Sequence, residues 1–571
     1  MPGVMVFLCR CCGRIPPTVD LSALGEKIDR EEGVVAVETR DTICLPEDRA
    51  AMLRSFEDSG ADRILVAACS PYGKADDVVA KLSAACGGDR SRVRLVDIRE
   101  GCAWIHRRDP VGATAKAGDL IRMNLGFLRH GKCSADAVVA VRPECMVVGA
   151  GSAGMAAALS IARAGHRVHL VERGAGMGGM LKLLSHVYPT DAGAEEKLKP
   201  SLQAISAQPL ITLHAKTRVA AATGYAGDFK IRLASGTEET NLHVGAVILA
   251  TGAGVWLPRG LYRYGELKGV LTLMELERRR KEGEETPRRS VFIQCVGARC
   301  PERPYCATFC CPSSIKNAAL IKKEDPGAEV TILHRDIMTP GAILERYYRS
   351  ALEAGVRFIR FAADAPPVVS GEGKVDSVAV FDTISGVKRE IAADQVILST
   401  PLVANADHAK LADLFHIGID RYGFFREDYP LHPLETRQAG VFICGSARWP
   451  VASGDAAAQG EGAAMKALAI LGRERLSARS LSRLPEGKLG HARIEDAFCS
   501  GCGNCVAVCP YEACALQKVG GIFVSRVNKM RCRACGSCTS VCPNGTIQMP
   551  EHNARAVGAM IRRAFSLREA R

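Results

Sequence analysis

The sequence has no long hydrophobic run and few aromatic residues. No apolar stretch reaches the roughly 18 residues that a membrane-spanning helix needs, and the first residues lack a charged segment followed by a long apolar one. We therefore expect a cytoplasmic protein without a secretory signal, which would meet a membrane only through a partner. Aromatic residues make up 5% of the chain and are not interleaved with a basic stripe, which argues against nucleic-acid binding.

The length and charge indicate several soluble domains. A chain of 571 residues is too long for one hydrophobic core, and a hydrophobic share of 47% is ordinary for globular proteins. The net charge is +13, and part of it lies in residues 473–488 and in the final residues. A solvated linker and a solvated last helix explain this charge, and a docking surface for an acidic electron-transfer partner is the alternative.

Cysteine is unusually frequent, with 24 residues. Disulfides explain dense cysteine in small secreted chains, whereas a long chain without an export signal is better explained by metal or cluster binding.

The first 132 residues alternate between short apolar runs and helical patterns. This alternation predicts a parallel sheet with helices on both faces. The expected strands are Val4–Leu8, Val34–Thr39, Arg63–Ala68 and Arg92–Ile98, and the expected helices are Ser22–Glu32, Pro46–Ser59, Lys74–Ala85 and Pro110–His130.

A nucleotide-binding motif opens the next α/β unit. Gly149, Gly151 and Gly154 form G-x-G-x-x-G between an apolar strand and a helix. The first glycine makes the turn, the second lets the backbone approach a pyrophosphate, and the third lets the helix pack against the strand. Glu172 ends the following strand, where an acidic group bonds a ribose hydroxyl. The motif alone does not distinguish FAD from NAD.

Three later segments favour FAD because they resemble the thioredoxin-reductase-like flavoprotein family. They are Gly178-Gly179, the ATGAG run Ala250–Gly254, and GVFICG at Gly440–Gly445. The chain departs from the family at Ser446, where an aspartate is usual, so the ribityl contact is expected to be weaker or to come from backbone. The resemblance implies that the cofactor contacts Ser152, Ala153, Arg173, Thr251, Gly252, Gly445 and Ser446 in addition to the glycines and the glutamate above.

Two cysteine runs near the C-terminus share the spacing C-x2-C-x2-C-x3-C-P. Three close thiolates bind one cubane, and the fourth cysteine of each run crosses to the other cluster. The spacing resembles the bacterial two-cluster ferredoxin domain and predicts one [4Fe–4S] cluster on Cys499, Cys502, Cys505 and Cys542, and another on Cys532, Cys535, Cys538 and Cys509.

A third α/β unit carries cysteines where a second dinucleotide motif is expected. After the strand Ser290–Gln294 the chain lacks a glycine-rich loop, so direct NAD(P)H binding is disfavoured. The run C-x10-C-x3-C-C resembles the A-type subunits of heterodisulfide reductase, where such a run ligates a [4Fe–4S] cluster. The resemblance implies Cys295, Cys306, Cys310 and Cys311 as ligands, and a redox dithiol is the alternative.

Four cysteines follow the four expected strands of the N-terminal domain. Ligands gather outside the carboxyl ends of parallel strands, so these side chains are expected at one edge of the sheet. They predict a further cluster on Cys9, Cys44, Cys69 and Cys102, with buried core cysteines as the alternative.

The resemblance to the A-type heterodisulfide reductase family covers nearly the whole chain. It implies a flavin hub in a complex with B- and C-type subunits of that reductase, an electron-input module (a hydrogenase, a formate dehydrogenase or an NADH-oxidising unit) and ferredoxin, in some members with bifurcation. No cysteine lies between Gly178 and Gly252, so the second ferredoxin insert of longer members is absent. A relay subunit similar to the quinone-interacting oxidoreductases of sulfur metabolism fits as well, and a pyridine-nucleotide enzyme like the glutamate synthase small subunit is a further alternative.

The expected architecture is α/β with a ferredoxin-like α+β end. Its parts are an N-terminal domain (1–132), a thioredoxin-reductase-like FAD core with two Rossmann subdomains (143–472, the second about 287–400), a basic linker (473–490), a ferredoxin domain (491–550) and a basic tail (551–571).

Overall fold

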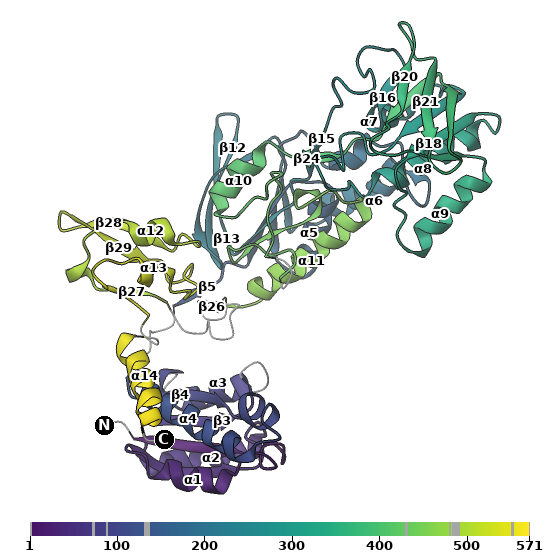
Figure 1. Cartoon of the computed structure of the whole chain (residues 1–571). Helices are drawn as coiled ribbons and strands as arrows, with labels where there is room; N and C mark the ends of the chain where they lie inside the picture. The colour runs from purple at the N-terminus through teal and green to yellow at the C-terminus, as the bar shows by residue number, and fades with distance from the viewer. Residues whose placement is uncertain are drawn as a thin grey trace. The chain divides into compact units, whose positions relative to one another are not determined.

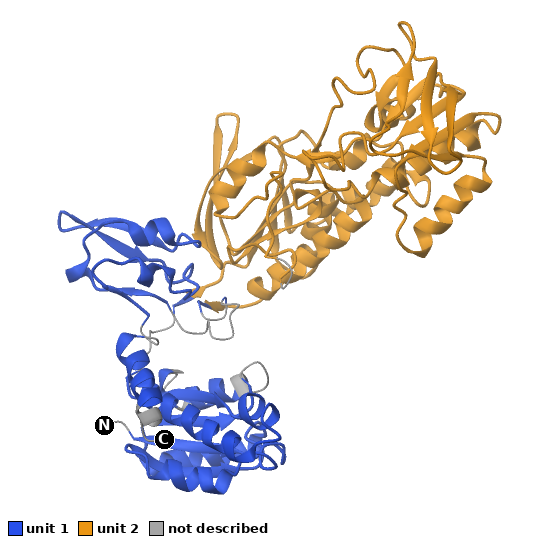
Figure 2. Cartoon of the chain, in the orientation of Figure 1, with its two compact units in different colours: residues 1–138, 477–571 blue, residues 139–476 orange. Residues whose placement is uncertain are grey.

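The computed structural model describes residues 3–70, 75–86, 90–130, 137–428, 432–478, 481, 491–549 and 553–569. The chain forms two compact units, one of residues 1–138 with 477–571 and one of residues 139–476 (Figure 2). Much of the expected linker lies outside the described residues, as do residues 551, 552, 570 and 571 of the expected tail. Within the described ranges, no helix is both long and apolar enough to cross a membrane.

The N-terminal part of the first unit is a four-stranded parallel sheet in the order β2-β1-β3-β4. Its elements are β1 (Val4–Cys9), α1 (Leu21–Asp29), β2 (Val34–Arg40), α2 (Pro46–Ser59), β3 (Arg63–Ala68), α3 (Ala75–Ala85), β4 (Val93–Asp97), the π-helix η2 (Arg99–Trp104) and α4 (Pro110–Leu128) (Figure 1). Every residue of β1 is buried, and its alternate side chains enter two cores on opposite faces of the sheet. A central strand covered on both faces is typical of parallel α/β sheets, which confirms the predicted architecture.

The C-terminal part of the first unit is a small α+β fold built around cysteines. Two strand pairs frame it, β27 (Arg493–Ile494) with β30 (Ile547–Gln548) and β28 (Cys514–Val519) with β29 (Ile522–Val527). Two short helices, α12 (Asn504–Val508) and α13 (Ser537–Ser540), complete it. Its buried cluster contains Cys505, Cys514 and Cys538 but few aliphatic side chains. Such a small apolar core gains stability from bound metal groups.

The last helix, α14 (Ala554–Glu569), packs along α4. The contact is close because Gly126 has no side chain: a Cβ there would lie 3.2 Å from the Ala559 carbonyl oxygen. Arg563 also forms an ion pair with Glu31 at 2.6 Å. Part of the basic charge of the tail is therefore neutralised inside this unit.

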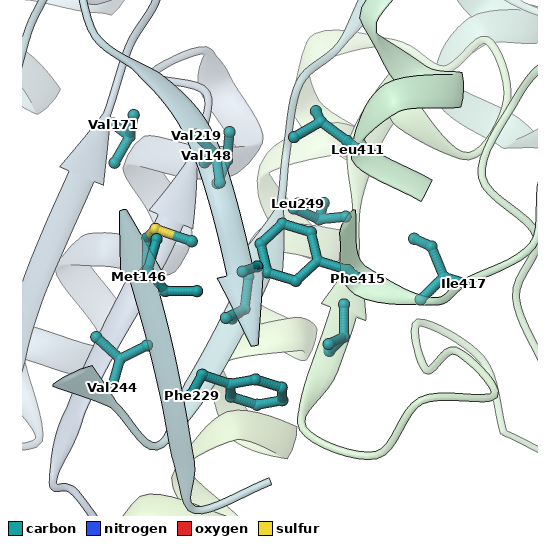
Figure 3. Packing of buried hydrophobic residues seen from close by; sticks show 14 of the residues in the cluster. Met146, Val148, Val171, Val219, Phe229, Val244, Leu249, Leu411, Phe415 and Ile417 are labelled. Atoms are coloured by element: carbon teal, nitrogen blue, oxygen red, sulfur yellow. The ribbon is translucent and has the colours of Figure 1, made fainter. Parts of the chain in front are cut away.

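The second unit begins with a five-stranded parallel sheet in the order β10-β7-β6-β14-β25. The strands are β6 (Glu144–Val148), β7 (Arg167–Val171), β10 (Ile211–His214), β14 (Ala246–Leu249) and β25 (Val441–Ile443), with helices α5 (Ser152–Arg163), α6 (Ala194–Ser206) and α11 (Ser453–Leu471). An antiparallel sheet of β11 (Arg218–Tyr225), β12 (Asp228–Ser235) and β13 (Glu238–Val244) covers one side. Met146, Phe229 and Leu249 meet there in a core that also takes in Phe415 from α10 (Asp407–Phe415) (Figure 3).

A second parallel sheet in this unit has the order β16-β23-β17-β18-β19. Its strands are β16 (Val270–Thr272), β17 (Arg289–Ile293), β18 (Glu329–His334), β19 (Arg357–Arg360) and β23 (Gln395–Leu398), with helices α7 (Leu273–Lys281), α8 (Cys310–Glu324) and α9 (Gly341–Glu353). Three antiparallel strands complete it: β20 (Val368–Ser370), β21 (Ser377–Asp382) and β22 (Val387–Ala392). The two-Rossmann prediction is confirmed.

The start of α7 shows why the charged segment at 275–289 becomes helical. Thr272 and Glu275 form a reciprocal capping box, in which the Glu275 carboxylate accepts the Thr272 backbone N–H at 2.7 Å. Capping boxes satisfy two of the otherwise unpaired donors of a helix start. The short strands β15 (Ala253–Val255) and β24 (Leu402–Ala404) pair antiparallel within the same unit, and β5 (Val138–Ala140) pairs with β26 (Arg475–Ser477).

Candidate functional site

The turn from β6 into α5 is built so tightly that only glycine fits. Gly149 has φ +104°, and a Cβ there would lie 2.4 Å from the Ala250 carbonyl oxygen. A Cβ on Gly154 would lie 1.8 Å from the Gly149 carbonyl oxygen. Gly151 is the N-cap of α5 and makes no side-chain cap, so the first N–H groups of the helix are left for a ligand. This is the geometry that binds a pyrophosphate.

A cavity of about 780 Å³ opens at this turn, and a smaller one of about 100 Å³ shares several of its residues. Together they have room for an elongated ligand with a buried ring at the larger end. The predicted residues that line the larger cavity are Gly149, Gly151, Ser152, Ala153, Glu172, Arg173, Gly179, Thr251, Gly252 and Ser446. The smaller cavity lies at the ribose-binding acid, as an adenosine end would require.

Three predicted residues do not line either cavity. Gly154 lets α5 approach β6, because a side chain there would collide with the turn. Gly178 (φ +109°) and Gly445 (φ +65°) take left-handed backbone conformations, and a Cβ on Gly445 would lie 2.9 Å from the Ala153 Cβ. These glycines support the walls of the cavity without facing it.

Glu172 and Arg173 fix the edge of the cavity. The Glu172 carboxylate accepts the backbone N–H of Ala150 at 2.9 Å and that of Gly174 at 2.7 Å. Each oxygen keeps a further lone pair that a ribose hydroxyl can use. Arg173 pairs with Asp407 at 2.9 Å, which holds the guanidinium beside the acid.

A buried ion pair in the wall of the cavity was missed by the sequence reasoning. Lys316 of α8 and Glu277 of α7 both line it, and their charged ends pair with each other. Glu277 also accepts from Asn317 Nδ2 at 2.6 Å and from Ser185 Oγ at 2.9 Å. Burial opposes the charge on Glu277, but Lys316 and these donors outweigh it and lower the pKa of Glu277. Burial lowers the pKa of Lys316, against the effect of Glu277.

Cys444 and Ser446 have different surroundings although they are close in sequence. Cys444 is fully buried, and burial raises its pKa to about 12. It is therefore a packing residue and a poor nucleophile. Ser446 faces the cavity, and its hydroxyl lies 3.4 Å from the Val451 backbone nitrogen.

The two ferredoxin-type cysteine runs converge on two separate small cavities. One, of about 20 Å³, is lined by Cys499, Cys502, Cys505 and Cys542. The other, of about 10 Å³, is lined by Cys509, Cys532, Cys535 and Cys538. Each set takes three thiols from one run and one from the other, which is the crossed arrangement expected for two cubanes.

The donor chemistry of both sets fits iron–sulfur clusters. All eight thiols are unpaired by disulfides, and soft thiolates suit clustered iron. Over the ranges that the structure describes, no three His, Cys, Asp or Glu side chains converge on a single ion position. A cubane differs from a single ion because each thiolate binds its own iron at a separate corner.

Cys514 lies beside the second set. It lines the same cavity and bonds the sulfurs of Cys509 and Cys538. Its hydrogen bond lowers the pKa of Cys509 to about 5, whereas its own pKa is raised. Sequence spacing gave no sign of this contact, because Cys514 falls outside both runs.

The cysteines of the third α/β unit gather between β17 and α8. Cys310 and Cys311 form the first turn of α8, and Cys295 follows β17 with φ +60°. Cys310 interacts with Cys295, Cys306 and Cys311. Burial raises the pKa of Cys295, and Arg299 opposes that shift. The structure thus brings the four predicted thiols together at a helix N-terminus, where thiolates are favoured.

The N-terminal cysteines only partly come together. Cys9 and Cys44 contact the same core on one face of the sheet, whereas Cys102 packs in the core on the opposite face. Cys69 interacts with Cys9 and with Cys11, which the sequence reasoning did not select. Burial raises the pKa of Cys9 to about 11.

Arg99 ties Cys11 to this group. Its guanidinium donates to the Cys11 sulfur at 2.9 Å, and Cys11 itself has a left-handed φ of 51°. The structure does not bring Cys102 to the other three predicted ligands, and Cys11 lies nearer to them. The signal that could have found Cys11 is its place in the Cys9–Cys12 run directly after β1.

Two protein families match parts of the chain. Residues 143–293 match the family described as pyridine nucleotide-disulphide oxidoreductase. Residues 491–556 match the 4Fe-4S dicluster domain. These ranges coincide with the glycine-lined cavity and with the two cysteine cavities. The chain therefore carries an FAD-binding oxidoreductase domain and a [4Fe–4S] domain.

Solved structures similar to the second unit include two thioredoxin reductases. That of T. acidophilum is 19% identical, with a TM-score of 0.41 over 57% of this chain and 99% of its own. That of Lactococcus lactis is 21% identical, with a TM-score of 0.41 over 57% of this chain and 98% of its own.

Curated relatives match the chain over nearly its full length, and all are A-type subunits of a reductase complex. An iron–sulfur subunit of this type from the CoB--CoM heterodisulfide reductase of Methanopyrus kandleri is 30% identical over 91% of both chains. Its counterpart from Methanocaldococcus jannaschii is 31% identical over 96% of both. The corresponding subunit of the H(2)/formate:CoB-CoM heterodisulfide,ferredoxin reductase of Methanococcus maripaludis is 31% identical over 98% of both. The chain belongs to the A-type family of heterodisulfide reductase iron–sulfur subunits and is a flavin- and iron–sulfur-containing oxidoreductase.

Proposed function

We propose that this chain converts two-electron transfer at FAD into one-electron transfer along [4Fe–4S] clusters inside a heterodisulfide reductase-like complex. The observation that carries the proposal is the presence, in one chain, of a glycine-lined cavity and several separate groups of cysteines. FAD supplies chemistry that accepts an electron pair and releases single electrons, and the protein supplies orientation and electrostatics.

The proposal includes four cluster sites. Two are the crossed sets of the ferredoxin domain, and a third is the set of Cys295, Cys306, Cys310 and Cys311. For the fourth, in the N-terminal domain, we propose Cys9, Cys11, Cys44 and Cys69. This choice follows the placement of the side chains, because Cys102 packs on the other face of the sheet.

Residues of the cavity wall position the flavin and handle its protons in this proposal. The first N–H groups of α5 bind the pyrophosphate, and Glu172 holds a ribose. The ammonium of Lys316 faces the cavity and carries a proton that is held in place by Glu277. A buried charged donor of this kind stabilises negative charge that develops beside it.

The partners follow from the relatives' names, which mention H(2), formate and ferredoxin. We propose the B- and C-type subunits of a heterodisulfide reductase as acceptors, with ferredoxin as a second acceptor. A hydrogenase, a formate dehydrogenase or an NADH-oxidising module would be the donor, all in the cytoplasm. Bifurcation would add simultaneous reduction of both acceptors, although residues 178–252 carry no cysteine for an extra cluster chain.

Anaerobic isolation of the chain with its native partners tests the proposal. Adding the donor substrate (H(2), formate or NADH) should reduce the flavin first and then bleach the cluster absorbance. Bifurcation predicts that ferredoxin and disulfide are reduced in equal amounts and only when both are present. Reduction of the clusters by the donor in a flavin-free preparation would contradict the flavin's place in the path.

A further inference from the structure

A second large cavity of about 460 Å³ lies in the second Rossmann subdomain, away from the glycine-lined turn. Its wall comes from residues just after β17, β18 and β19, including Gln294, Arg335 and Phe361, and from the loop that carries Trp256. Ligands of open α/β sheets bind outside the carboxyl ends of the strands, and small-molecule pockets have this range of volume. The cavity therefore has the position and size of a ligand site.

The charge of the wall selects an anion. Arg259, Arg303 and Arg335 line the cavity, and Glu302 is the only acidic side chain among its lining residues. Across the described part of the chain, no ion pair is formed by any of these three arginines. Arg303 and Arg335 each use one donor on a backbone carbonyl, of Gly297 at 2.5 Å and of Arg299 at 3.0 Å. Most of their five donors remain for a phosphate or a carboxylate.

Gln294 is the second, independent sign of a ligand. Its side chain is 1% exposed and lines the cavity, yet neither its amide nitrogen nor its carbonyl oxygen has a hydrogen-bond partner. Buried polar groups are nearly always paired, so an unpaired amide facing a cavity indicates a missing partner such as a ligand or ordered water. An amide offers both donors and an acceptor, which suits a ring or hydroxyl group.

The cavity is not the space of the neighbouring cluster. Of the four thiols assigned to that cluster, only Cys295 lines the cavity, whereas Cys306, Cys310 and Cys311 do not. A dinucleotide is also a poor fit, since the segment after β17 lacks a glycine-rich loop and α8 begins with two cysteines. Trp256, Tyr262 and Phe361 add apolar surface for an organic body.

We propose that this cavity binds a phosphorylated organic anion of about mononucleotide size, with the arginines at the phosphate and Gln294 at the organic body. The proposal is independent of electron transfer, because binding alone measures it. It is distinct from the flavin site, which lies on the first Rossmann subdomain.

Calorimetric titration of the anaerobic, flavin- and cluster-loaded full chain tests it, with adenosine 5′-phosphate as the probe. Saturable binding is expected, weaker binding for inorganic phosphate, none for adenosine, and none tighter for NADPH. Arg259→Gln should weaken binding by about 10- to 100-fold, the usual loss for one charged hydrogen bond. Arg357→Gln, an exposed arginine of the same subdomain that pairs with Glu329, is the matched control and should bind normally.

Gln294→Leu gives a second readout. It should remove binding while raising the melting temperature of the ligand-free protein, because it deletes an unsatisfied buried amide. Absence of saturable binding of adenosine 5′-phosphate would overturn the proposal. So would equal binding by Arg259→Gln and the unaltered chain, since the anion would then sit elsewhere. Tighter binding of NADPH than of the mononucleotide would replace the proposal with a dinucleotide site.

Discussion

Lys316 and Glu277 form an ion pair in which each side chain exposes only 2% of its surface, in the wall of the flavin cavity. They come from α8 and α7 of the second Rossmann subdomain. Glu277 also accepts from Ser185 of the first half of the unit. The pair thus connects both halves of the flavin domain at the place where the cofactor would lie.

Lys316→Met is expected to cost about 3–5 kcal/mol of unfolding free energy, because it leaves the Glu277 carboxylate buried without its counter-ion. The double variant with Glu277→Gln should recover much of that loss. Chemical denaturation of the unaltered chain, both single variants and the double variant gives the coupling. Purely additive effects would show that the pair does not interact.

The same substitution predicts a pH dependence. In the unaltered chain the pKa of Glu277 is lowered, so its contribution to stability is present above the unfolded value of 4.5 and is lost only in acid. Without Lys316, burial raises that pKa above the unfolded value, and the folded state then binds the extra proton. The stability deficit of Lys316→Met should therefore grow as the pH rises from mildly acidic to neutral. A deficit that is flat over this range would argue against a buried, ionised Glu277.

The crossed ligand sets predict which cluster each cysteine serves. Cys542→Ala should disturb the cluster that also uses Cys499, Cys502 and Cys505, although Cys542 belongs to the other run. Electron paramagnetic resonance of the reduced protein should lose one signal and its coupling to the neighbour. Cys514→Ala is the control, since it borders the second set without being assigned to it, and it should keep about eight irons in the two clusters. Loss of the other cluster in Cys542→Ala would contradict the crossing.

The N-terminal placement predicts a contrast between two cysteines. Cys11→Ser should lower the iron content by about four atoms per chain, the content of one cubane. Cys102→Ser should keep the iron and lower only stability, because Cys102 is buried in an apolar core. Iron analysis of anaerobic preparations distinguishes them. If only Cys102→Ser lost iron, the ligand set expected from strand ends would be right and Cys11 would be excluded.

NADPH alone should not bleach the flavin. The pyrophosphate cradle of a second dinucleotide site is missing, since α8 starts at Cys310 and Cys311. Anaerobic stopped-flow absorbance with NADPH and no partner checks this. Rapid reduction would favour a pyridine-nucleotide enzyme over an electron-transfer subunit.

Much of the site was predictable where the chemistry is local. The tight turn at Gly149–Gly154 and the crossed cysteine runs depend on spacing within a few residues, and both take the expected geometry. The pair of Lys316 and Glu277 could not be predicted, because it joins two helices whose approach depends on the whole subdomain. Cys102 follows its strand as expected, but the π-helix after β4 turns its side chain into the core. Strand-end position therefore predicts an edge of the sheet but not a side-chain direction.

The most direct test of the account is the flavin and iron content of the anaerobically isolated full chain. The account predicts one FAD per chain together with at least about eight irons from the two clusters of the ferredoxin domain. A preparation with its clusters intact but no bound flavin, or one with flavin and fewer irons than these two clusters contain, would contradict it.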